Sequence, residues 1–142
     1  MKLTLLLLVT AGLGFADDRA KPADDLTRLQ GVWKLVSATR DGKEMPEDRA
    51  KFLRARISGD TFTILDNGKA VEAGMLKLDI TKDPKQIDMT LANDRRPALG
   101  IYELRRDTYK LCYSPPGKER PKTFAAKPGS GYTMAVWRRD RK

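Results

Sequence analysis

The side chains that could do acid–base chemistry in this chain are carboxylates, because none of the 142 residues is histidine. Without imidazole the chain lacks the usual general base near neutral pH, the usual zinc ligand and the usual partner of a serine or cysteine nucleophile. Two carboxylates could still hydrolyse a glycosidic bond. Acidic residues are available near the ends or on the outer faces of strand-like segments: Asp79, Asp83, Asp88, Glu103 and Asp107. Their spacing singles out no pair, so we expect a non-enzymatic protein without cofactor or metal, with a carboxylate hydrolase as the minor alternative.

Cys112 is the only cysteine, so the chain cannot form an intramolecular disulfide. A lone cysteine in a strand is more often a small buried hydrophobe than a reactive thiol. We therefore predict that Cys112 is buried and that the protein is a monomer.

A proline-rich segment after Ser114 is the loop best suited to bind something. Pro115 and Pro116 stiffen it, while Lys118 and Arg120 present cations that could hold an anionic ligand. A rigid lid or plug that binds nothing is the alternative, because proline can stabilise a loop by itself.

Three tyrosines, Tyr102, Tyr113 and Tyr132, could give a cavity aromatic walls with hydroxyl tips. They could equally belong to a packed core. Both alternatives remain open, because an eight-stranded barrel is narrow enough for its own side chains to fill.

The N-terminus has the pattern of a cleavable signal peptide. Lys2 precedes the apolar run Leu3–Phe15, which is too short for the roughly 20 apolar residues that a membrane-spanning helix needs. Small residues at Gly14 and Ala16 predict cleavage after Ala16. We expect a periplasmic or secreted protein with no transmembrane segment, beginning at Asp17.

The net charge of +9 indicates a basic surface. Export argues against nucleic acid as a partner, although such a charge would suggest it in the cytosol. A solvated basic surface and a surface that meets an anionic envelope polymer or anionic lipid headgroups both remain possible.

After a flexible leader at residues 17–25 and a helical turn at 26–30, the rest of the chain reads as one β domain, residues 26–142. Strand-like patterns occupy residues 32–38, 55–58, 61–65, 69–78, 87–91, 98–104, 108–114 and 132–138, and a short helix is predicted at 46–53. The fold class predicted is all-β: an antiparallel up-and-down barrel of about eight strands, with one short helix after the first strand. Closure would leave no unpaired sheet edges.

Two details of strand geometry can be predicted. Alternation in the first strand places Trp33, Leu35 and Ser37 on one face. In the fourth strand the apolar phase slips around Gly74, where we predict a β-bulge that bends the sheet.

Three segments, Leu29–Lys34, Leu99–Leu104 and Leu111–Pro121, resemble an uncharacterised family of exported planctomycete domains. The similarity runs from about Leu26 to Arg138, and the block Cys-x-x-Pro-Pro-Gly-Lys-Glu-Arg-Pro is its most specific part. No established activity comes with that family.

A wider resemblance is to lipocalins, in which a Gly-x-Trp motif opens the first strand of an eight-stranded barrel. Gly31-Val32-Trp33 matches that motif. The resemblance implies that Trp33 lies at the closed end of the barrel and that Arg138 or Arg139 stacks on it.

Two functions are therefore considered. The first is a non-catalytic envelope module that holds a small apolar or amphipathic molecule in the barrel mouth. The second is an interaction module with a filled barrel, whose basic surface binds an anionic envelope polymer or another protein. Candidate ligand-binding residues are Trp33, Tyr102, Tyr113, Lys118, Arg120, Tyr132 and Arg138.

Overall fold

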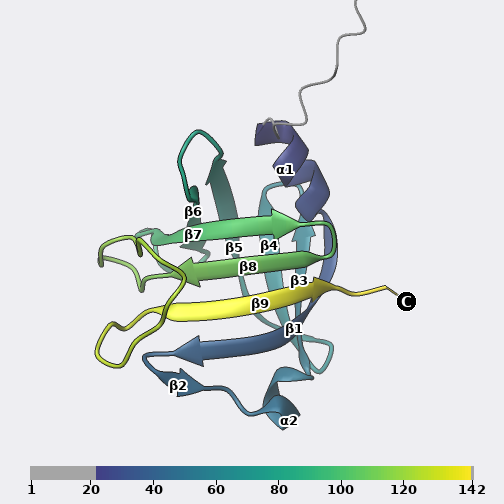
Figure 1. Cartoon of the computed structure of the whole chain (residues 1–142). Coiled ribbons are helices and arrows are strands. Elements are labelled where there is room, and N and C mark those ends of the chain that lie inside the picture. The colour runs from purple at the N-terminus through teal and green to yellow at the C-terminus, as the bar shows by residue number, and fades with distance from the viewer. Residues whose placement is uncertain (1–21, 142) are drawn as a thin grey trace, which may run out of the picture.

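Nine antiparallel strands form a single sheet that closes on itself (Figure 1). The structure is a computed structural model and describes residues 22–141, so the predicted signal peptide lies outside the described residues. The strands are β1 (Gly31–Arg40), β2 (Lys43–Glu44), β3 (Leu53–Ser58), β4 (Thr61–Asp66), β5 (Lys69–Asp79), β6 (Lys85–Leu91), β7 (Ala98–Arg105), β8 (Thr108–Tyr113) and β9 (Thr133–Arg139). The helices are α1 (Pro22–Leu29) and α2 (Glu47–Ala50).

The strands are connected up and down. Each strand from β3 to β9 pairs with its neighbour along the chain, and β1 pairs with both β3 and β9. Eight strands thus close into a barrel, and β2 is an extra strand paired with β1. In Figure 1, β7, β8, β9 and β1 form the front wall, with β3 to β6 behind them. The predicted up-and-down barrel, with a short helix after its first strand, is confirmed.

The N-terminal helix begins earlier than predicted. The assignment of residues 17–25 to a flexible leader is wrong for 22–25, because α1 starts at Pro22. Proline is tolerated in a first helical turn, and the aspartates at 24 and 25 suit the positive end of the helix dipole. Asp25 is also fully buried, which its charge did not suggest.

A β-bulge in β1 changes which of its side chains point into the barrel. The register shifts between Leu35 and Ser37. Trp33 and Leu35 are buried before the bulge, whereas Ala38 is buried after it and Arg40, which is exposed, lines the cavity. The predicted shared face of Trp33, Leu35 and Ser37 is therefore wrong at Ser37, because the extra residue reverses the alternation.

A second bulge lies in β5. Ile64 of β4 pairs with Glu72 and the next residue of β4 pairs with Ala70, which leaves Val71 as the bulged residue. The bulge predicted at Gly74 is therefore misplaced. Glycine is needed at that position for close packing, since a Cβ there would lie 2.3 Å from a carbonyl oxygen of β6.

Large side chains fill one end of the barrel, which α1 covers. Leu29 and Trp33 are fully buried there, and Tyr102 is 1% exposed. We call this the closed end; the β3–β4, β5–β6 and β7–β8 connections lie at it. The β4–β5, β6–β7 and β8–β9 connections surround the opposite end, which we call the open end.

Arg139 of β9 ties α1 to the barrel at the closed end. Its guanidinium carbon lies 4.4 Å from the centroid of the Trp33 ring. Its N–H groups donate hydrogen bonds to the main-chain oxygens of Arg28 and Gln30, and the Trp33 indole N–H donates to the Leu29 oxygen at 2.8 Å. A cation at this position satisfies carbonyl groups that the helix end leaves unpaired.

The contact predicts unequal roles for two adjacent arginines. Arg139 stacks on Trp33, whereas Arg138 is exposed. We expect Arg139→Met to lower the free energy of unfolding by about 2–3 kcal/mol, because it removes a cation–π contact and charged hydrogen bonds. The matched control Arg138→Met should change it by less than about 0.5 kcal/mol. Urea denaturation measures both, and equal losses would contradict this assignment.

Candidate ligand cavity

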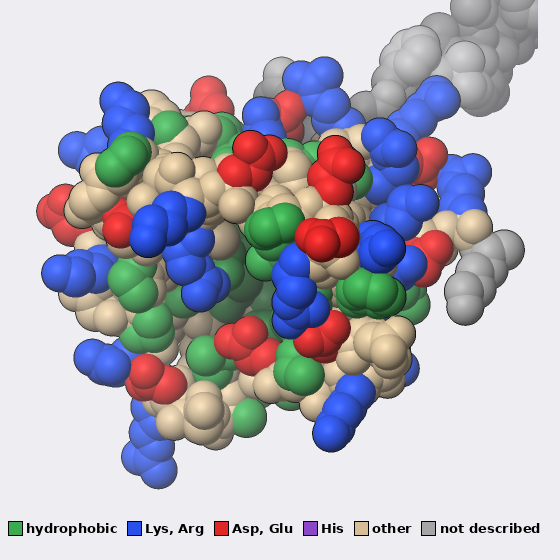
Figure 2. Space-filling model, turned by 90° about the horizontal axis from the view of Figure 1, so that it is seen from below, with side chains coloured by type: hydrophobic (Ala, Val, Ile, Leu, Met, Phe, Trp, Pro, Cys, Tyr) green, Lys and Arg blue, Asp and Glu red, His purple; other side chains and the backbone are tan. Residues whose placement is uncertain are grey.

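The open half of the barrel encloses a cavity of about 350 Å³. This volume falls within the range of about 300–1,000 Å³ that is typical of small-molecule sites. Figure 2 shows a hollow with hydrophobic side chains inside it and charged side chains around it. All eight barrel strands contribute to the lining, which is mainly apolar: Ala55, Ile57, Phe62, Ile64, Leu76, Ile87, Met89, Leu91, Ala98, Leu111, Ala135 and Trp137.

The cavity exists because small side chains occupy inward positions around it. Ala55 of β3, Ala98 of β7 and Ala135 of β9 all line it and are nearly buried. Larger residues at these positions could have filled a barrel of this size. The interior is thus packed at the closed end and hollow at the open end, a division that the sequence left undecided.

An aromatic cluster separates the two halves. The ring centroid of Tyr109 lies 5.8 Å from that of Trp33 and 6.4 Å from that of Tyr102, in tilted and edge-on arrangements that aromatic rings favour. Tyr109 also lines the cavity, so it forms part of the floor. Burial raises the pKa of its hydroxyl, which therefore stays neutral at physiological pH.

Beneath this floor, Asp25 of α1 forms a buried polar network with two strands. Its Oδ2 accepts hydrogen bonds from the Tyr102 hydroxyl at 2.6 Å and the Lys85 ammonium at 3.1 Å. Its Oδ1 lies 3.5 Å from the Arg28 guanidinium but accepts no hydrogen bond within the described part of the chain. Burial first, and then the bond to Asp25, raise the pKa of Tyr102. The network fixes α1 over the closed end.

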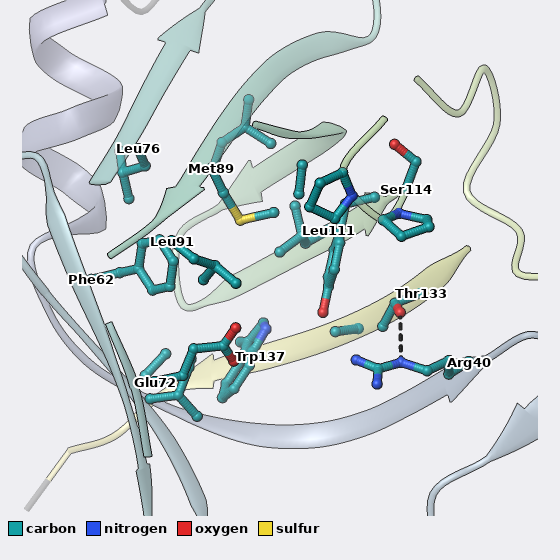
Figure 3. A pocket seen from close by; sticks show the side chains of 18 of the residues that line it. Arg40, Phe62, Glu72, Leu76, Met89, Leu91, Leu111, Ser114, Thr133 and Trp137 are labelled. Atoms are coloured by element: carbon teal, nitrogen blue, oxygen red, sulfur yellow. Dashed lines mark hydrogen bonds between the residues drawn. The ribbon is translucent and has the colours of Figure 1, made fainter. Parts of the chain in front are cut away.

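Two opposite charges line the cavity on its open side. Arg40 ends β1, and its Nε donates a hydrogen bond to Thr133 Oγ1 at 3.1 Å. Glu72 lies near the start of β5. Figure 3 shows the two side chains approaching from opposite sides of the view.

Of the residues predicted from the sequence, Tyr113 lines the cavity. Trp33 and Tyr102 belong to the packed closed end and lie outside the lining. Tyr132, which is half-buried, and Arg138, which is exposed, do not line it either. The structure therefore brings one of these five to the cavity wall.

The cation predicted at Arg120 is already engaged by the protein. Its guanidinium donates to the main-chain oxygens of Ile87 and Gly100 at 3.1 and 2.7 Å and to Asp88 Oδ1 at 2.7 Å. These bonds fasten the β8–β9 connection to β6 and β7. Lys118 in the same connection is exposed and does not line the cavity.

The same connection still contributes to the cavity, through its prolines. Pro115 and Pro116 line the cavity together with Ser114, whose hydroxyl bonds the Leu99 and Lys118 oxygens. The geometry thus matches a rigid rim more closely than an anion-binding loop.

The residues missed by the sequence analysis are Arg40 and Glu72. Both follow or border a bulge, and strict alternation does not predict the face of a residue beyond a bulge. The local sequence around Arg40 and Glu72 gave no other indication that they line a cavity.

The candidate acids lie away from the cavity. Asp79 accepts bonds from the Thr81 hydroxyl and amide, which lower its pKa. The Arg105 guanidinium bonds Glu103 and lowers the pKa of that carboxyl group. Carboxylates held ionised in this way are poor general acids. Asp88 and Asp107 form ion pairs with arginines, and Asp83 is exposed.

Cys112 is a buried free cysteine, as predicted. Its Sγ lies 3.6 Å from the Ala125 oxygen, and burial raises the pKa of the thiol. A neutral, covered thiol has little nucleophilic character.

These features define a class: a closed eight-stranded barrel, capped by a helix at one end, with an apolar cavity open at the other. The chain matches no protein-family model, no curated protein and no solved structure. Within residues 22–141, no helix is long and apolar enough to cross a membrane, and no three potential ligands among Cys, Asp and Glu cluster in a way that would hold a metal ion.

Proposed function

We propose that this protein is an exported, non-catalytic binding module of the cell envelope that holds a small apolar or amphipathic molecule in its barrel. The observation that carries the proposal is the cavity of about 350 Å³ with mainly apolar walls. Apolar cavities of this size are costly unless something occupies them, because the residues around them lose contacts. The apolar run Leu3–Phe15 supports the envelope location.

Rigidity of the surroundings also favours a binding role. The β8–β9 connection is fastened by Arg120, and α1 is fastened by Arg139 and Asp25. A cavity held open before the ligand arrives binds at a smaller entropic cost. The described residues thus resemble a preformed container more than a site that assembles on binding.

The two tryptophans allow a direct test. Trp137 lines the cavity, whereas Trp33 lies at the closed end. A bromine-bearing long-chain alcohol, 11-bromo-1-undecanol, should quench the fluorescence of Trp137 when it enters. Quenching should persist in Trp33→Phe and be lost in Trp137→Phe, with circular dichroism to confirm that both variants fold. Quenching that depends on Trp33 would contradict the proposal.

A second pair of variants tests the proposal independently, in case either tryptophan variant unfolds. Ala98→Phe places a ring in the cavity, whereas Ala73→Phe adds the same ring to an exposed position of β5. We expect the first to weaken binding of the brominated alcohol at least about tenfold, or about 1.4 kcal/mol. Equal affinity in the two variants would place the ligand elsewhere.

A second candidate function is adhesion to an anionic envelope polymer. Lys34 of β1 pairs directly with Arg54 of β3 and Arg138 of β9, which places three cations in a row on the barrel's outer face. Like charges opposite one another are destabilising, so an anionic partner would relieve this row. Asp140 already bonds Arg54, however, and the hollow interior argues against the filled barrel that this alternative assumed.

A further inference from the structure

We propose that the cavity selects amphiphiles with a zwitterionic headgroup, one that carries an anionic group and an ammonium group together. This inference rests on the proposed function and specifies its ligand. It is carried by two exposed residues of opposite charge, Arg40 on β1 and Glu72 on β5, which line an otherwise mainly apolar cavity.

Arg40 is positioned to hold an anion. Its Nε is used by Thr133 Oγ1, at 3.1 Å, which fixes the direction of the guanidinium. Its two terminal nitrogens make no hydrogen bond to any other residue in the range 22–141. A guanidinium held by one edge presents its remaining donors in a fixed geometry that suits carboxylate or phosphate.

Glu72 is positioned to hold a cation. Glu72 is exposed and lines the cavity (Figure 3), and its carboxylate forms no ion pair with any residue of the described chain. An ammonium group prefers an acceptor of this charge.

The barrel geometry keeps these two charges from neutralising each other. Arg40 lies on β1 and Glu72 lies on β5, which is three strands from β1 through β3 and β4 and five strands away in the other direction around the barrel. A single headgroup can pair with both residues if it carries an anionic group for Arg40 and an ammonium group for Glu72. The apolar walls below would then take the ligand's hydrocarbon part.

Singly charged amphiphiles fit this arrangement less well. A fatty acid carboxylate at Arg40 leaves Glu72 without a partner and adds a second negative charge to the cavity. An alkylammonium at Glu72 leaves Arg40 without a partner and adds a second positive charge to the cavity. Because Arg40 and Glu72 are exposed, each missing ion pair costs a modest part of the binding free energy, and both ligands lose that part of their affinity relative to a zwitterion.

Four probes with the same dodecyl length separate these cases: dodecan-1-ol, dodecanoate, dodecylammonium and the zwitterion 2-aminododecanoate. Isothermal titration calorimetry below the micelle concentrations should rank 2-aminododecanoate tightest, about threefold above each singly charged probe. Arg40→Met should remove its advantage over dodecylammonium, and Glu72→Gln should remove its advantage over dodecanoate. Dodecan-1-ol should bind all variants alike.

Arg56→Met and Glu47→Gln are the matched controls, since both residues are exposed and lie outside the cavity. They should leave the ranking unchanged. If dodecan-1-ol binds but the headgroup ranking is absent, or survives both cavity variants, the zwitterion inference is overturned while the proposed function stands. If none of the four probes binds, the proposed function is overturned together with it.

Discussion

Pairing of β1 with β9 turns an extended sheet into a closed barrel, and the interior is defined by that pairing. Because β1 must pair with β3 on one side and β9 on the other, it has to bend strongly, and the bulge between Leu35 and Ser37 provides the bend. The bulge also reverses the side-chain alternation. The strand that buries Trp33 at one end therefore places the exposed Arg40 along the cavity wall at the other.

This division along the barrel axis explains how one small domain can be both stable and hollow. The closed end contains the large buried side chains, the Arg139 stack and the Asp25 network, and these hold α1 in place. The open end has alanines at inward positions, other apolar walls around the cavity, and two charged side chains in the lining. Stability is concentrated away from the site, so the cavity can remain unfilled without loss of the fold.

Most of the fold could be predicted from the sequence, because it depends on local signals. All eight predicted strands are present, and in the turn between β4 and β5 Asn67 and Gly68 adopt positive φ values of 50° and 83°, which an Asn-Gly pair tolerates. Helix α1 was partly missed because Asp25 is stabilised by Tyr102 and Lys85, residues distant in sequence. Tertiary contacts of this kind leave no local pattern.

The site was harder to predict than the scaffold, for two physical reasons. Residues chosen for their chemistry, such as Arg120 and Trp33, are used for internal contacts that depend on the three-dimensional arrangement. The charges that do face the cavity lie beyond bulges, whose positions are set by closure of the sheet. Tyr113 was chosen for its aromatic ring, and of the three tyrosines chosen in that way it alone lines the cavity.

The central claim is that the hollow end of the barrel admits a ligand, and methionine methyl NMR tests it most directly. Among the described methionines, only Met89 lines the cavity, while Met75 is 53% exposed and Met134 lies on β9 outside the lining. With ¹³C-methyl methionine, saturating dodecan-1-ol should shift the Met89 resonance, assigned through Met89→Leu, and leave those of Met75 and Met134 in place. An unchanged Met89 resonance, or a shift confined to Met75, would contradict the account.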